Sequence, residues 1–126
     1  MKKLVLIATA AILVFGAGLL VGANRFGKPK SILHIVTVKW KADATPAQKT
    51  AALKGVEKMA GEIPGVKNVW MDTVKVQGDG YHNVFVMEFE NADAFKVYAD
   101  HAAHKEWEAV YLPVRGESTT HDATNK

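Results

Sequence analysis

The chain holds five histidines, and two of them, His101 and His104, lie three positions apart. On a helix this spacing would place both imidazoles on one face, where an acidic neighbour could complete a zinc-type site. No third ligand follows at a fixed spacing, so we do not predict a metal site. Phosphate-binding glycine loops, nucleophile elbows and a Ser/His/Asp order are absent as well. We therefore expect no cofactor.

Tyr98 is a further residue that could do chemistry, and it lies six positions before His104. Six residues of straight helix would separate the two by about 9 Å at a rise of roughly 1.5 Å per residue. The two side chains meet only if the chain bends between residues 100 and 103. Structural roles are the alternative: Tyr98 as a core residue with a hydrogen-bonded hydroxyl, and His101 or His104 as a cap on the preceding helix.

His34 interrupts an apolar run, Ser31 to Lys41, whose β-branched and aromatic residues predict a strand. A histidine in such a run is either satisfied within the core or directed into a cavity, and the sequence leaves both open. His82 and His121 are expected at the surface.

The elements that position these residues follow from the same patterns. Thr45-Pro46-Ala47-Gln48 combines an N-cap, a proline at the first helical position and a capping-box glutamine, which predicts a helix from Pro46 to about Gly61. Strands over residues 66–76 and 81–90 should form a hairpin around a turn at 77–80. Asn91 caps a helix that continues to about Ala99, and another helical turn or two should end before Pro113. Residues 115–122 are a poor candidate for a fourth strand.

The resulting order, β-α-β-β-α-β, is that of an α+β ferredoxin-like sandwich. Helices cover one face of such a sheet, and yet the predicted strands are apolar on both faces. A lone domain would expose the second face, so we expect a protein partner, most simply a second copy packed sheet against sheet in a homodimer.

The N-terminal segment is of a different kind. Leu4 to Ala23 carries no charge and is long enough to cross a bilayer as a hydrophobic helix, and it follows Lys2 and Lys3. Residues 1–23 are therefore either a signal peptide cleaved after Ala23 or a transmembrane anchor, residues 24–30 are a linker, and residues 31–126 are one domain. Either reading predicts export, periplasmic or otherwise extracytoplasmic, with membrane attachment through residues 4–23 if they are retained.

The net charge of +3 belongs to this segment. Residues 1–30 hold five of the 16 basic residues and no acidic one, so the domain has 11 basic against 13 acidic residues, a net charge of −2. Without a basic stripe, nucleic-acid binding is not expected. The absence of cysteine excludes disulfides and thiolate chemistry.

Four blocks of sequence resemble the stress-responsive alpha/beta barrel domain family, Dabb, of the dimeric alpha-beta barrel superfamily. They are the opening run Ile32 to Trp40, the helix end Ile63 to Val66, the hairpin with Gly80-Tyr81 and Glu88-Phe89, and the block Tyr98 to His104. The family usually has proline where Ala102 stands. The resemblance implies a ferredoxin-like protomer whose sheet pairs with another to enclose a cavity, forming a dimeric α/β barrel.

The resemblance also implies site residues. One plant branch of the family closes polyketides by aldol condensation, and its acid/base histidine falls on His104, its tyrosine partner on Tyr98 and its first-strand histidine on His34. An imidazole can remove a proton next to a carbonyl while a phenol stabilises the oxyanion that forms. Trp40 and His101, which belong to the matching blocks, are candidate ligand-binding residues.

The resemblance leaves two functions open. The first is an exported or membrane-tethered Dabb protein that is stress-responsive or binds a small apolar or aromatic ligand, with no established reaction. The alternative is an acid/base enzyme of polyketide-cyclase or lyase type that uses the histidine and tyrosine pair in the barrel cavity.

Overall fold

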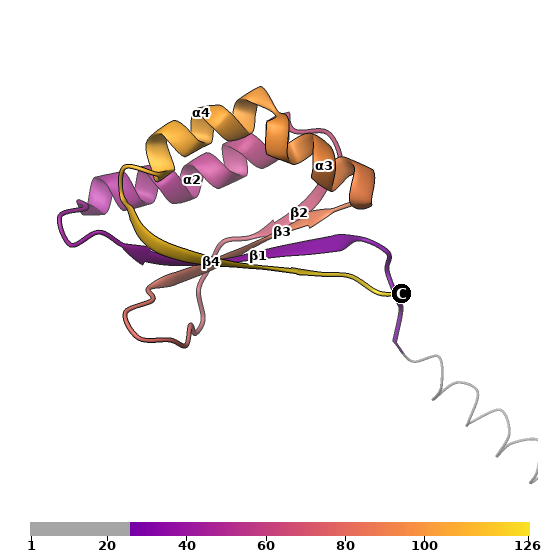
Figure 1. Ribbon diagram of the computed structural model, residues 1–126, viewed down its shortest axis with the longest axis horizontal. Helices are drawn as coiled ribbons and strands as arrows, with labels where there is room; N and C mark the ends of the chain where they lie inside the picture. Colours follow the sequence, from indigo (N-terminus) through magenta and orange to yellow (C-terminus); the bar gives the residue numbers. More distant parts are fainter. Residues whose placement is uncertain (1–25) are drawn as a thin grey trace, which may run out of the picture.

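The computed structural model describes residues 26–126, in which four antiparallel strands form one sheet and three helices pack on one of its faces (Figure 1). The strands are β1 (Ile32–Trp40), β2 (Val66–Trp70), β3 (Asn83–Phe89) and β4 (Arg115–Ala123). The helices are α2 (Pro46–Glu62), α3 (Ala92–Asp100) and α4 (Ala102–Tyr111). The sheet order β2-β3-β1-β4 confirms the predicted ferredoxin-like fold.

Helix α2 begins where the capping signals predict. The Thr45 hydroxyl accepts a hydrogen bond from the Gln48 backbone at 3.2 Å, and the Gln48 side chain accepts one from the Thr45 backbone at 2.9 Å. These bonds satisfy two backbone N–H groups that the first turn would leave without partners. The apolar stripe of α2 is buried as expected, with Ala52, Val56 and Met59 almost fully covered.

The even-numbered residues of β1 face the helices, and the odd-numbered ones face away. His34, Val36 and Val38 therefore share the helix-covered face, and on β3 their neighbours Phe85 and Met87 do the same. The buried core lies between this face and the helices. Its members include Val36, Val38, Trp40, Phe85, Met87, Phe89, Ala52, Val56, Met59, Tyr98, Ala103, Trp107 and Tyr111.

The second strand is shorter than predicted, because β2 ends at Trp70 instead of near residue 76. The Thr73 hydroxyl donates to the Val84 carbonyl at 3.1 Å and accepts from the Val84 N–H at 2.9 Å. A side chain therefore satisfies the β3 backbone where a continued strand would have done so. Residues 71–82 form a connection, and the hairpin pairing of β2 with β3 is confirmed.

The C-terminal segment corrects a second expectation. Residues 115–122 were a poor strand candidate, yet Arg115–Ala123 pairs with β1 from Trp40 back to Leu33. Its sequence is polar because β4 is an edge strand that stays largely accessible, so alternation of apolar residues is not required of it.

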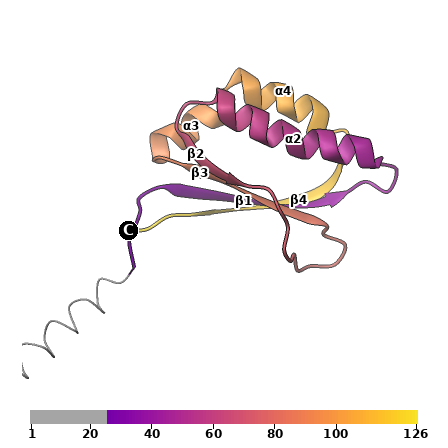
Figure 2. The same ribbon diagram turned by 180° about the vertical axis from the view of Figure 1, so that it is seen from behind.

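The face of the sheet away from the helices is open to solvent (Figure 2). It carries apolar side chains at Leu33 and Ile35 of β1 and at Val84 and Val86 of β3, and Trp70 of β2 is half exposed. This arrangement agrees with the predicted second apolar face.

The two ends of the described chain lie together (Figure 1). The Asn125 amide donates to the Pro29 carbonyl at 2.8 Å, and the Thr124 hydroxyl donates to the Ser31 carbonyl at 2.8 Å. The predicted signal peptide or hydrophobic anchor at residues 1–23, and the first part of the linker at 24–30, lie outside the described residues. Within residues 26–126, none of the helices combines the length and apolar character needed to span a bilayer.

Candidate functional site

A pocket of about 210 Å³ lies between α4 and the helix-covered face of β1 and β4. His34, Tyr98 and His104, the three residues assigned from the family resemblance, all line it. They come from β1, α3 and α4, and so the fold brings together residues as far apart as positions 34 and 104. Their convergence is the main geometric result at this site.

Tyr98 and His104 meet because the chain bends between α3 and α4. His101 takes an extended backbone conformation, with φ −66° and ψ 140°, and its imidazole Nδ1 accepts from the Ala103 N–H at 3.1 Å. The bend brings the Tyr98 and His104 rings to a centroid distance of 4.2 Å, where a straight helix would give about 9 Å. The predicted bend is confirmed.

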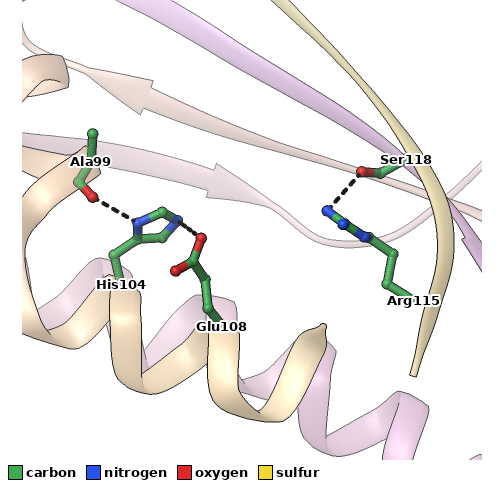
Figure 3. Close-up of polar contacts among 5 residues, drawn as sticks. All are labelled: Ala99, His104, Glu108, Arg115 and Ser118. Carbon is green, nitrogen blue, oxygen red and sulfur yellow. Dashed lines mark hydrogen bonds and ion pairs between the residues drawn. The ribbon is translucent and has the colours of Figure 1, made fainter. Parts of the chain in front are cut away.

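The His104 imidazole is held at both nitrogens (Figure 3). Nδ1 lies 3.2 Å from the Ala99 carbonyl oxygen, and since a carbonyl can only accept, Nδ1 carries a proton. Nε2 lies 3.7 Å from a Glu108 carboxylate oxygen. In the neutral ring Nε2 therefore has the free lone pair and lies on the side of the Glu108 carboxylate.

His104 also meets the structural alternative, because the Ala99 carbonyl belongs to the last turn of α3. The imidazole caps the preceding helix through Nδ1 and still presents Nε2 to the pocket side. The His101 backbone N–H donates to the Tyr98 carbonyl at the end of α3, and its side chain caps the start of α4.

His34 makes a comparable pair with Asp122. Its Nδ1 lies 2.6 Å from the Asp122 carboxylate, and the two residues are register partners across β1 and β4. Only 11% of the His34 side chain is exposed, and its ring lies 5.5 Å from that of Tyr98. His34 is thus both largely buried and directed into the pocket.

Tyr98 is buried, and this burial raises the pKa of its hydroxyl, with the negative charge of Glu108 contributing a smaller rise. The phenol therefore stays protonated at neutral pH. It is suited to donate a hydrogen bond and not to act as a base.

The other end of the pocket is formed by Tyr111 at the end of α4 and by Arg115 and Ser118 on β4. Arg115 Nη1 donates to the Ser118 hydroxyl at 3.3 Å (Figure 3). The Arg115 guanidinium carbon lies 5.6 Å from the centre of the Tyr111 ring. Burial raises the pKa of Tyr111, and nearby Ser118 and Arg115 oppose the rise.

Arg115, Ser118 and Thr120 were missed from the sequence because they lie on β4, the strand that was poorly predicted. Alternation along β4 places Ser118 and Thr120 on the pocket face. A register shift opposite Lys39 and Trp40 adds Arg115 to the same side. Recognising residues 115–123 as a strand would have found them.

Trp40 and His101, the two candidate ligand-binding residues, do not line this pocket. Trp40 is a core residue whose indole N–H donates to the Asn83 side chain at 2.7 Å and whose ring meets Tyr111 edge to face. His82 and His121 are exposed, as expected. No three metal-ligating side chains among residues 26–126 lie close enough together to hold a metal ion.

Two other hollows have no histidine in their lining. One of about 100 Å³ lies between α2 and α4 beside Gly55 and Trp107. Another of about 420 Å³ lies on the open face of the sheet, beside Leu33, Trp70 and Glu88. Hydrogen bonds from Ser31 and Asn68 lower the pKa of Glu88 there.

Comparisons with known proteins agree with this fold. The family model described as "Stress responsive A/B Barrel Domain" matches residues 32–125. A stress-response A/B barrel domain-containing protein of Arabidopsis thaliana is 32% identical over 85 residues, which are 64% of this chain and 74% of that protein. Olivetolic acid cyclase of Cannabis sativa is 29% identical over 84 residues, which are 64% of this chain and 83% of the cyclase.

Solved structures share the fold at lower identity. A dimeric ferredoxin-like protein of unknown function from Thermobifida fusca has a TM-score of 0.66 and 22% identity, covering 80% of this chain and 96% of the other. Hydroxynitrile lyase from Passiflora edulis has a TM-score of 0.70 and 14% identity, covering 78% of this chain and 95% of the lyase.

Proposed function

Because the chain belongs to the stress-responsive A/B barrel domain family, we propose that it binds a small organic molecule in the pocket between β1, β4 and α4. The observation that carries the proposal is the convergence of His34, Tyr98 and His104 on one pocket of about 210 Å³. Trp107 and Tyr111 add aromatic walls, and their rings stack at 4.3 Å. An apolar cleft with a few convergent polar groups is the usual form of a small-molecule site.

Ligand binding is tested by titrating the protein with aromatic and polyketide-like small molecules while following the indole fluorescence and NMR signals of Trp107. Ser118→Phe, which fills the pocket, should abolish binding. Lys105→Phe, at an exposed position on α4 outside the pocket, should leave binding unchanged. Binding that survives Ser118→Phe would contradict the proposed location.

Acid/base catalysis of the cyclase or lyase type is the second candidate, and the hydrogen bonds of His104 favour it. With Nδ1 bonded to Ala99, Nε2 can accept a proton from a carbon next to a carbonyl. The protonated Tyr98 hydroxyl can then donate a hydrogen bond to the oxygen that gains charge. Both similar enzymes, a cyclase and a lyase, make this class reasonable.

Catalysis is tested by assaying the same small molecules for turnover. If turnover is found, His104→Gln should remove most of it, while Tyr98→Phe should lower it by about 10²-fold or more, as expected for loss of one oxyanion donor. Turnover that His104→Gln leaves unchanged would end the assignment of that residue.

We also propose that the protein is a homodimer in which the open sheet faces meet. The apolar residues Ile35, Val86 and Trp70 on that face support this, as does the dimeric neighbour from Thermobifida fusca. Sedimentation should give a dimer, Val86→Lys a monomer, and Val97→Lys, at a half-exposed position on α3, a dimer. A monomeric wild-type protein at micromolar concentration would refute the proposal.

Export remains a proposal supported by the apolar run Leu4 to Ala23. The protein would act outside the cytoplasm, either released after cleavage or tethered by the uncleaved segment. The intact mass of the protein from membrane and soluble fractions distinguishes the two forms, and recovery of the full-length chain only from the cytoplasm would contradict both.

A further inference from the structure

The end of the pocket opposite the histidines is formed by Tyr111, Arg115 and Ser118. It has more hydrogen-bond donors than acceptors. The Tyr111 hydroxyl is buried. Ser118 and Arg115 approach it closely enough for hydrogen bonding to lower its pKa, but within residues 26–126 neither forms a hydrogen bond of ordinary length and angle with it. A buried hydroxyl without a partner costs about 1–3 kcal/mol, so such groups ordinarily have one. Tyr111 is only 4% exposed and lines the pocket.

Arg115 is the second donor at this end. Its guanidinium has five N–H donors, and the described contacts use one of them, toward the Ser118 hydroxyl. The described ion pairs of residues 26–126 do not include Arg115. Since the Ser118 oxygen accepts from Arg115, the Ser118 proton remains available to donate.

The acidic residues of the pocket region lie beside the histidines. Asp122 lies 2.6 Å from His34, and Glu108 lies 3.7 Å from His104. The permanent cation, Arg115, lies over the Tyr111 ring and bonds the Ser118 hydroxyl, and it forms none of the ion pairs of residues 26–126. A charge of opposite sign is missing beside Arg115.

We propose that the pocket takes a small organic monoanion whose carboxylate binds between Arg115, Ser118 and Tyr111. This inference deepens the proposed function and rests on it, because it names the ligand class of the same pocket. A carboxylate supplies the acceptors that these three residues lack, and guanidinium and carboxylate match in geometry. The rest of the ligand then extends along Trp107 toward Tyr98 and His104.

A phosphate group fits less well. It would bring a second negative charge into a pocket that already has the Glu108 carboxylate on its wall and Asp122 beside His34. A single carboxylate places one negative charge beside Arg115, which forms none of the ion pairs of residues 26–126. The proposal therefore commits to monoanionic carboxylates.

The experiment compares benzoate, phenylacetate and hexanoate with their neutral primary amides, using calorimetry and NMR on the full chain. The measurements are made at pH 8, where the three acids are ionised. We expect at least one acid to bind roughly tenfold or more tightly than its amide, in line with a charge-assisted pair. Arg115→Met should remove that preference, and Arg115→Lys should keep part of it.

Lys105→Met is the matched control, because it removes one positive charge from the exposed side of α4. It should leave the preference unchanged. Equal binding of acids and amides by the wild-type protein would overturn the carboxylate proposal while the pocket itself stands. Binding of none of the six compounds would overturn both, and inorganic phosphate competing more strongly than the acids would replace carboxylate with phosphate.

Discussion

Gly55 of α2 lies beneath the indole of Trp107, and Gly55→Ala tests the packing that holds the pocket wall. A Cβ at Gly55 would lie 2.7 Å from Trp107 Cδ1 and 3.3 Å from Nε1. The indole has little freedom to move away, because Nε1 donates to the Ala52 carbonyl at 2.9 Å and the ring stacks on Tyr111 at 4.3 Å. The substitution therefore forces the Trp107 indole, which forms part of the pocket wall, to move.

Two opposing effects determine the magnitude. Alanine is favoured over glycine inside a helix by about 1 kcal/mol. Overpacking a filled interior typically costs about 1–3 kcal/mol. We expect Gly55→Ala to lower the free energy of unfolding by about 0–2 kcal/mol, the difference between the two effects.

Gly61→Ala is the matched control on the same helix. Nothing lies within 4 Å of a Cβ built there, so this variant should gain about 0.5–1 kcal/mol from helix propensity alone. Urea denaturation of the two variants and the wild type measures the difference directly. In a Trp107→Leu background, where the indole is absent, Gly55→Ala should instead raise the free energy of unfolding. Equal stabilisation by both alanines in the wild-type background would refute the packing argument.

Three further results are expected. The folded-state pKa of Tyr98 lies above its ordinary value of 10.0, so the wild type should lose stability as pH rises above about 10. Tyr98→Phe should lose less stability over pH 8–11 in urea denaturation. Parallel profiles for the two proteins would contradict the burial argument. The pKa of Glu88 is lowered by Ser31 and Asn68, so its stabilisation is present above about pH 4.5 and is lost as pH falls further, and Glu88→Gln should flatten this acid limb in the same assay. Thr45→Ala removes the cap of α2 and should cost about 1 kcal/mol in thermal or urea unfolding, whereas Thr45→Ser should cost much less.

Sequence patterns predicted the parts of the fold in which local chemistry and burial agree. The capping box at Thr45 and the apolar run of β1 each satisfy local and tertiary requirements at once, and both form where expected. The bend between Tyr98 and His104 followed from geometry, because the two side chains could meet only if the helix was interrupted between them. The family resemblance supplied the three residues that converge on the pocket.

The length of β2 and the existence of β4 were predicted poorly because, in both, strand pairing does not follow the apolar pattern of the sequence. The Thr73 hydroxyl takes over the pairing that would have extended β2. In β4, pairing to β1 provides the strand, and its polar residues carry no apolar alternation to detect. Trp40, a candidate ligand-binding residue from the blocks that match the family, lies in the core.

The residues of strand β4 alternate between two surfaces of the protein. Strand β4 is an edge strand paired with β1, and its residues Arg115, Ser118 and Thr120 line the pocket. The intervening residues, such as Thr119 and His121, lie on the opposite face, where a partner sheet would meet them. Substitutions at alternate positions of β4 would thus change the ligand that the pocket binds and leave the opposite face of the sheet unchanged. A family with such a strand can vary its ligands on one fold.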